Sequence, residues 1–205
     1  MKVAYMDEED VALDTRLNPP FVEVAPRSCF SRLITELFDH SQRNSPSTVM
    51  LTSPHRKAGV SFICSNIAVE LALQGEKVLL VDGRALLSVR LSPLQSVNLL
   101  CRRIGPLDLW VLAMEDVNGR STSTETLTSS AVSAQIRELE KFYTYVLIDA
   151  PALSVGVDAN ILAASVYGTL LVARADHTRD EELRKACRTL RAVGGLVLGS
   201  VFNAH

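Results

Sequence analysis

The feature that most constrains this chain is the alternation of short apolar runs with longer amphipathic segments. Runs that are apolar throughout are typical of strands buried on both faces of a parallel sheet, and apolar residues at helical spacing indicate helices that cover such a sheet. The alternation predicts an α/β fold with a doubly wound, mostly parallel sheet, helices on both faces and right-handed crossovers. The predicted strands are 48–52, 77–82, 107–113, 145–149, 169–173 and 196–202, and the predicted helices are 28–40, 61–73, 128–142, 158–165 and 180–193.

Length and charge limit what such a sheet can do. The chain has 205 residues, a formal net charge of −2 and 47% hydrophobic residues, which is enough for one domain with a sizeable core. We expect a mobile or draped N-terminal segment over 1–26, where acidic residues and prolines mix without a period, and a single domain over 27–205. A near-neutral chain lacks the basic surface that binds phosphates along nucleic acids, so a general nucleic-acid binder is excluded.

The cysteines and the hydropathy pattern bear on location. The four cysteines are far apart and form no CxxC or Cys/His ligand spacing, so neither a zinc site nor a disulfide framework is indicated. The start of the chain lacks the basic and apolar regions of a signal peptide, and no apolar run is long enough to span a bilayer. We therefore expect a cytoplasmic protein, at most peripheral to the inner membrane.

The chemistry is expected where predicted strands end. Ligands of doubly wound sheets bind beyond the carboxyl ends of the strands. A polar loop over 52–61 follows the first predicted strand, and Asp82 and Asp149 end two later ones. A strand, loop and helix followed by apolar strands ending in Asp is the ground plan of a P-loop nucleotide-binding protein.

Three stretches of sequence make the resemblance specific. From about residue 26 onward the chain resembles the deviant-Walker P-loop ATPases of the MinD/ParA type and, within them, the bacterial tyrosine kinases (BY-kinases) of capsule and exopolysaccharide synthesis. The order and spacing of the segments carry this resemblance more than any one motif does. They are VMLTSPHRKAGVSFICSNIAVELALQGEKVLLVDGR, LDLWVLAM and the long C-terminal run that contains YVLIDAP.

The loop after the first strand departs from the family pattern. The family loop resembles S-x-x-x-G-E-G-K-S/T, in which backbone N–H groups cradle phosphates and the Lys reaches the β- and γ-phosphates. By resemblance the nucleotide-binding residues here are Lys57, Gly59, Val60 and Ser61. Val60 stands at the phosphate Lys position, Lys57 replaces a glycine, and Ser61 stands where the Mg²⁺-binding hydroxyl belongs.

The chain keeps only some of the acidic residues of the family pattern. The family's V-D-A-D strand end corresponds to Val81-Asp82-Gly83-Arg84, so the first acid is kept and the second is a base. Asp149 matches the Asp of the family's I-I-D-x-P. The resemblance makes Asp82 and Asp149 vestigial or weak catalytic residues, Ser61, Asp82 and Asp149 the Mg²⁺ ligands if the ion is retained, and Asn203 the adenine contact. A structural cap is the alternative for Asp149, and a plain strand end for Asn203.

The first predicted helix resembles the family's oligomerisation helix without its charges. The E-x-x-R-x-x-R pattern of that helix falls on Ser28, Ser31 and Ile34. We therefore expect that this chain does not form the family's ring.

These departures predict a catalytically degenerate BY-kinase-like protein, a pseudokinase or pseudo-ATPase. Its expected role is that of a regulatory or scaffolding subunit in polysaccharide synthesis and export, with an inner-membrane polysaccharide co-polymerase as partner and with ATP or ADP and Mg²⁺ bound weakly. The alternative is an active ATPase or tyrosine kinase that uses Arg56 or Lys57. A third hypothesis, a MinD/ParA-type positioning ATPase, is weakened because His55 and Val60 stand where that type keeps lysines.

Overall fold

One twisted sheet forms the centre of the computed structural model, which describes residues 3–5, 27–38, 48–89, 100–117 and 128–204. Within these residues the neighbouring strands are parallel except for the pair β4 and β5. This confirms the predicted α/β fold with a doubly wound, mostly parallel sheet. The strand order is β1 (Val3–Tyr5), β8 (Val197–Asn203), β7 (Gly168–Arg174), β2 (Thr48–Thr52), β6 (Tyr145–Asp149), β3 (Val78–Asp82), β5 (Leu109–Leu112) and β4 (Arg102–Arg103).

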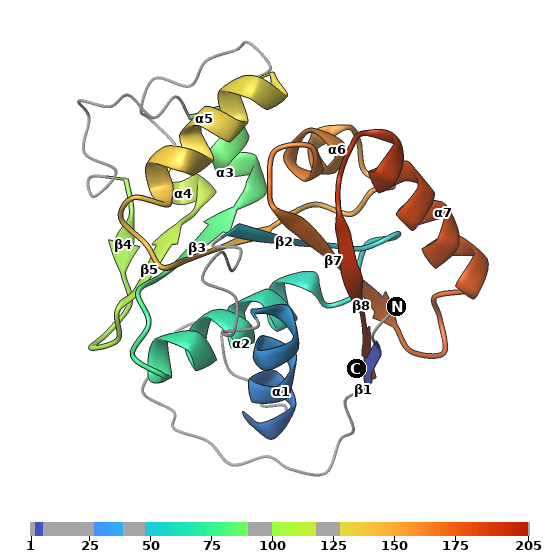
Figure 1. Ribbon diagram of the computed structural model, residues 1–205, viewed down its shortest axis with the longest axis horizontal. Helices are drawn as coiled ribbons and strands as arrows, with labels where there is room; N and C mark the ends of the chain where they lie inside the picture. The colour runs from blue at the N-terminus through green and yellow to red at the C-terminus, as the bar shows by residue number, and fades with distance from the viewer. Residues whose placement is uncertain (1–2, 6–26, 39–47, 90–99, 118–127, 205) are drawn as a thin grey trace.

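Helices cover both faces of the sheet (Figure 1). One face carries α1 (Arg27–Leu37) and α2 (Val60–Leu73), which contact each other. The other face carries the remaining described helices, which are α3 (Gly83–Ser88), α4 (Met114–Val117), α5 (Ser129–Leu139), α6 (Asp158–Ala163) and α7 (Asp180–Ala192).

The central strands are buried on both faces because their side chains alternate between two cores. Leu51 of β2 packs in the core beneath α1 and α2, whereas its neighbour Met50 packs in the core beneath α3, α5, α6 and α7. Both side chains are completely buried. This two-sided burial explains why the strands are apolar at successive positions rather than at alternate ones.

Two of the three positions in α1 where the resemblance expects the oligomerisation motif make contacts within the chain. Ile34 is 1% exposed in the core between α1, α2 and the sheet. The Ser31 hydroxyl donates a hydrogen bond to Glu70 Oε1 of α2 at 2.8 Å. These two positions therefore serve contacts within the chain.

Four short elements, β1, α3, β4 and α4, have no counterpart among the predicted strands and helices. Residues 3–5, within the segment expected to be mobile or draped, form β1 beside β8, and the expectation for the segment as a whole stays a prediction. The rest of that segment lies outside the described residues. The helix α3 follows directly on Asp82, whose carboxylate accepts a hydrogen bond from the Arg84 N–H at 2.9 Å and so caps the helix.

Two further findings concern location and cysteine chemistry. Among the described helices, none has the length and apolar content that crossing a membrane requires. All four cysteines are free, and Cys64 and Cys101 are buried.

Candidate functional site

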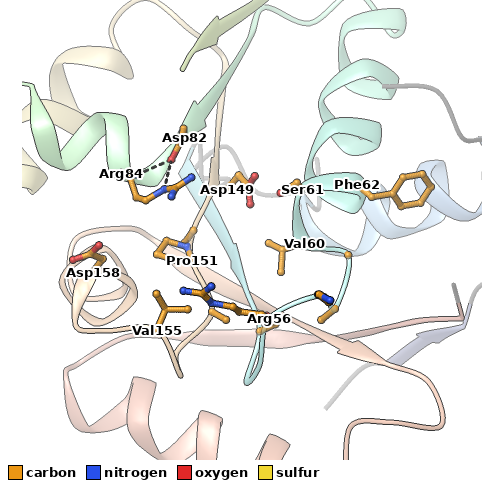
Figure 2. A pocket seen from close by; sticks show the side chains of 16 residues that line it. Arg56, Val60, Ser61, Phe62, Asp82, Arg84, Asp149, Pro151, Val155 and Asp158 are labelled. Carbon is orange, nitrogen blue, oxygen red and sulfur yellow. Dashed lines mark hydrogen bonds and ion pairs between the residues drawn. The ribbon is translucent and has the colours of Figure 1, made fainter. Parts of the chain in front are cut away.

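A cleft opens where β2, β3 and β6 end, as the strand order requires. Its volume is about 440 Å³. The side chains that face it come from the loop after β2, the start of α2, the start of α3, the loop after β6 and the start of α6 (Figure 2). The lining residues are Ser53, Arg56, Lys57, Ala58, Gly59, Val60, Ser61, Phe62, Asp82, Arg84, Asp149, Ala150, Pro151, Ala152, Val155 and Asp158.

Two residues of the loop between β2 and α2 have a left-handed backbone conformation. Lys57 has φ 65° and Gly59 has φ 85°. A left-handed φ is cheap for glycine but costs a residue with a Cβ roughly 1 kcal/mol. Lys57 therefore occupies a glycine conformation, in agreement with the glycine that the resemblance expects there.

The side chain of Asn203, at the end of β8, is hydrogen-bonded to this loop. Its side-chain Nδ2 donates a hydrogen bond to the Ala58 carbonyl oxygen at 3.1 Å, and the residue is 3% exposed. A Cβ on Gly59 would collide with the same amide nitrogen. Asn203 does not line the cleft, so its observed role is to position the loop, and its predicted contact with adenine stays a prediction.

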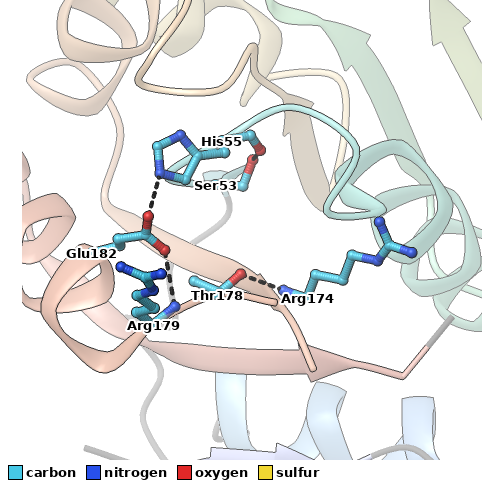
Figure 3. Close-up of polar contacts among 6 residues, drawn as sticks. All are labelled: Ser53, His55, Arg174, Thr178, Arg179 and Glu182. Atoms are coloured by element: carbon cyan, nitrogen blue, oxygen red, sulfur yellow. Dashed lines mark hydrogen bonds and ion pairs between the residues drawn. The ribbon is translucent and has the colours of Figure 1, made fainter. Parts of the chain in front are cut away.

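The other side of the loop is tied to α7 (Figure 3). His55 Nε2 lies 3.0 Å from Glu182 Oε1. The second carboxylate oxygen of Glu182 accepts the backbone N–H of Arg179 at 2.9 Å and caps α7. Ser53 donates its hydroxyl to the His55 carbonyl oxygen at 2.7 Å. The loop is thus held in place before any ligand arrives.

The amino terminus of α2 faces the cleft. Gly59 is its N-cap and makes no side-chain capping hydrogen bond. Unpaired N–H groups and the helix dipole make such a terminus attractive for anions. Val60, the first residue of α2, presents an isopropyl group to the cleft, and Arg56 and Lys57 of the loop line it as well.

Asp149 lies deepest among the carboxylates of the cleft. Burial raises its pKa to about 6, while a hydrogen bond from Ser61 and the charge of Arg84 oppose this rise and the charge of Asp82 adds to it. A carboxyl group with a pKa this far above its usual value is typical of functional sites. Its cost to folding also argues against a purely structural cap.

Asp82 is already engaged by a cation. Its Oδ1 lies 3.6 Å from the Arg84 Nε and accepts the Arg84 N–H at 2.9 Å. The Arg84 guanidinium extends from α3 toward Asp149 (Figure 2).

The resemblance implies a Mg²⁺ ion held by Ser61, Asp82 and Asp149, and these residues do meet in the cleft. They fit the ion poorly, because Ser61 bonds to Asp149 and the Arg84 guanidinium lies beside both carboxylates. Mg²⁺ requires near-octahedral oxygen ligands at short range, and a neighbouring cation repels it. In the described part of the chain, no group of three or more His, Cys, Asp or Glu is placed to hold a metal ion.

The structure brings together almost every residue that the sequence singled out. The predicted residues Lys57, Gly59, Val60 and Ser61 all line the cleft, as do both aspartates and Arg84. Sequence reasoning missed two of the lining residues, Val155 in the loop after β6 and Asp158 at the start of α6. The acidic start of the predicted helix 158–165 was the available signal for Asp158.

No family model matches the chain, but several known proteins are similar to it in sequence. CapB of Staphylococcus aureus is 26% identical over 209 residues, which cover 91% of this chain and 90% of CapB. The tyrosine-protein kinase CpsD of Streptococcus pneumoniae is 27% identical and covers 76% of this chain and 74% of its own length. ExoP of Rhizobium meliloti, a succinoglycan biosynthesis transport protein, is 28% identical over 87% of this chain, which spans only 25% of ExoP.

Solved structures agree on the fold. The kinase domain of the Escherichia coli tyrosine kinase Etk superposes with a TM-score of 0.72 at 18% identity and covers 98% of this chain and 88% of its own. The septum-site-determining protein MinD of Pyrococcus horikoshii, solved with Mg-ADP, gives a TM-score of 0.57 at 20% identity, with 77% and 70% covered. The chain is thus similar in sequence, over most of its length, to bacterial tyrosine kinases, and it has the P-loop fold that these kinases share with the MinD-type ATPases.

Proposed function

We propose that this chain is a nucleotide-binding but catalytically degenerate BY-kinase-like protein, a pseudokinase or pseudo-ATPase. The observation that carries the proposal is Val60, whose isopropyl group faces the cleft from the first position of α2. The resemblance expects the phosphate-binding Lys at this position. Phosphoryl transfer depends on positioning and charge stabilisation, and loss of one preorganised group of this kind typically costs ~10²–10³ in rate.

The second acidic position supports the same proposal. Where the resemblance expects an acid, Arg84 stands and binds Asp82. The carboxylate that would have to orient a reacting group is therefore held by a neighbouring side chain. The loop, Asn203 and the helix terminus still form a preorganised anion site, which favours retained binding of ATP or ADP over turnover.

We further propose that the protein is a regulatory or scaffolding subunit in bacterial polysaccharide synthesis and export. Its support is the similarity to CpsD and to ExoP, a succinoglycan biosynthesis transport protein. The proposed partner is an inner-membrane polysaccharide co-polymerase, which the chain would contact at its cytoplasmic face. Burial of Ile34 and the internal bond of Ser31 support an assembly that differs from the family ring.

A second candidate function is an active ATPase or tyrosine kinase with a non-standard loop. The observation in its favour is that Arg56 and Lys57 line the cleft beside the α2 terminus. Either side chain could bring a positive charge to a phosphate from a direction other than that of the missing lysine.

Phosphate release from ATP in the presence of Mg²⁺ separates the two functions. The proposal expects the unmodified chain to release no more phosphate than Lys57→Ala and Arg56→Ala, and Val60→Lys to gain activity or at least affinity. Turnover by the unmodified chain that disappears in either alanine variant would establish the active enzyme instead.

The partner proposal has its own test. Membranes from the source cell, solubilised in mild detergent, should yield a polysaccharide-export membrane protein together with the tagged chain. The control is the tagged chain with Ile34→Arg, a change that disrupts the packing of α1. Any membrane protein that this variant also retains is bound without need of the native fold. Recovery without any such membrane protein contradicts this part of the proposal.

A further inference from the structure

The position of Arg84 leads to an inference about how the cleft binds its ligand. The residue belongs to the first turn of α3, and its backbone N–H is fixed by the Asp82 carboxylate at 2.9 Å. Its Nε lies 3.6 Å from the same carboxylate. The first contact fixes the backbone of Arg84, the second holds its side chain near Asp82, and the guanidinium extends into the cleft toward Asp149 (Figure 2).

The guanidinium remains able to bind a ligand. The Arg84 side chain is 66% exposed, whereas that of Asp82 is 27% exposed. Its charge also reaches the second carboxylate, because Arg84 lowers the pKa of Asp149 against the effect of burial. The cleft therefore contains a cation that lies between two buried or half-buried carboxylates and faces solvent on its other side.

The cationic side chains of the cleft lie around the space next to the amino terminus of α2. Arg56 and Lys57 both line the cleft from the loop after β2. Arg84 lies on α3, across the cleft from Arg56 (Figure 2). The helix terminus contributes a further partial positive charge. A phosphate chain on that terminus would meet positive charge on both sides, although Val60 brings none.

We infer that Arg84 takes the place of the divalent cation, so that the cleft binds the phosphate chain of a nucleoside di- or triphosphate without Mg²⁺. This inference rests on the proposed nucleotide-binding function and specifies the form of its ligand. A guanidinium presents several N–H donors in a planar fork that matches phosphate oxygens. Unlike Mg²⁺, it needs no octahedral set of oxygen ligands.

Calorimetric titration of ATP and of ADP, once in EDTA and once in excess MgCl₂, tests the inference on the whole unmodified chain. We expect dissociation constants that differ by less than about 3-fold between the two conditions. In EDTA, Arg84→Gln should weaken ATP binding by about 10-fold or more, since a charge-assisted hydrogen bond is lost. Arg188→Gln, an exposed position on α7, is the matched control and should bind as the unmodified chain does.

A second variant, Arg84→Asp, tests the same inference through a different expected result. Arg84→Asp returns an acid to the cleft, so its ATP binding should be weak in EDTA and recover in MgCl₂. Thermal melts of both variants establish that they are folded, and the measurement on the unmodified chain needs no variant at all.

The outcomes separate this inference from the proposed function. Binding that requires MgCl₂, or equal binding by Arg84→Gln and the unmodified chain, overturns the inference and leaves nucleotide binding in place. Absence of binding in both conditions overturns the inference together with the nucleotide-binding part of the proposed function.

Discussion

The side-chain amide of Asn203, at the end of β8, donates a hydrogen bond to the Ala58 carbonyl oxygen at 3.1 Å, across 145 positions of the chain. The strand β8 thus fixes the loop that lines the candidate site. The same amide group occupies the space that a Cβ on Gly59 would need.

Gly59→Ala should therefore be strongly destabilising. The alanine would have to adopt a left-handed φ and displace a buried amide, at a cost of about 2–4 kcal/mol in the free energy of unfolding. Guanidinium unfolding measures this cost. Gly156→Ala is the control, because a Cβ there meets nothing within 4 Å and the change should stay within about 0.5 kcal/mol. Equal effects at both glycines would refute the packing role of Asn203.

Lys57→Gly should stabilise the protein, although it removes a charged side chain. Lys57 has a left-handed φ of 65°, and relief of this strain should outweigh the extra entropy that glycine gives the unfolded chain, for a gain of about 0.5–1 kcal/mol. Arg56→Gly, one residue earlier and without a positive φ, should lower the free energy of unfolding. The two variants should thus differ in sign, and a loss of stability in both would contradict the loop conformation.

Asp149→Asn should stabilise the fold at neutral pH. The pKa of Asp149 is raised from 3.8 to about 6 in the folded state, so the charged form is disfavoured there relative to the unfolded chain. The resulting destabilisation is absent below about pH 4, grows as the pH rises to about 6, and reaches about 3 kcal/mol above it. Loss of the Ser61 hydrogen bond reduces the net gain.

Urea unfolding of Asp149→Asn and of the unmodified chain at a series of pH values measures this effect. The two free energies of unfolding should converge at acid pH and diverge toward neutral pH. Asp176→Asn is the control, since Asp176 is exposed and Asn tolerates its positive φ of 59°. A difference that does not change with pH would show that Asp149 is not titrating as described.

Ile34→Arg, which restores a charge of the family pattern, should unfold the protein rather than assemble it. Ile34 is 1% exposed in the core beneath α1, and an unpaired buried guanidinium should cost more than about 3 kcal/mol. Arg32→Ala on the same helix is the control, because the Arg32 side chain is 79% exposed. Light scattering and thermal melts give the result, and a stable ring of Ile34→Arg would contradict the account of α1.

The fold could be predicted from the sequence because each central strand is a recognisable run of apolar residues. Each central strand is buried on both faces, so its run of apolar residues marks its position without reference to any partner. The resemblance then placed Ser61, Asp82 and Asp149 at neighbouring strand ends, and these residues meet in one cleft.

The unpredicted features depend on contacts that no local pattern encodes. No sequence pattern indicates that Asp82 caps a helix, because α3 is short and its first residue is a glycine. β1 consists of three residues and owes its structure to the edge of β8. The pairs His55–Glu182 and Asn203–Ala58 join segments more than a hundred positions apart.

We propose that the cleft holds a nucleotide without turning it over, because Val60 stands in place of a cation and the Arg84 guanidinium pairs with the Asp82 carboxylate. The decisive experiment incubates the purified chain with labelled ATP for a prolonged time and then identifies the bound nucleotide. We expect the protein-bound nucleotide to be recovered as intact ATP, with no label in the protein. Recovery as ADP, or label on a tyrosine, at a rate that Lys57→Ala abolishes would contradict this proposal.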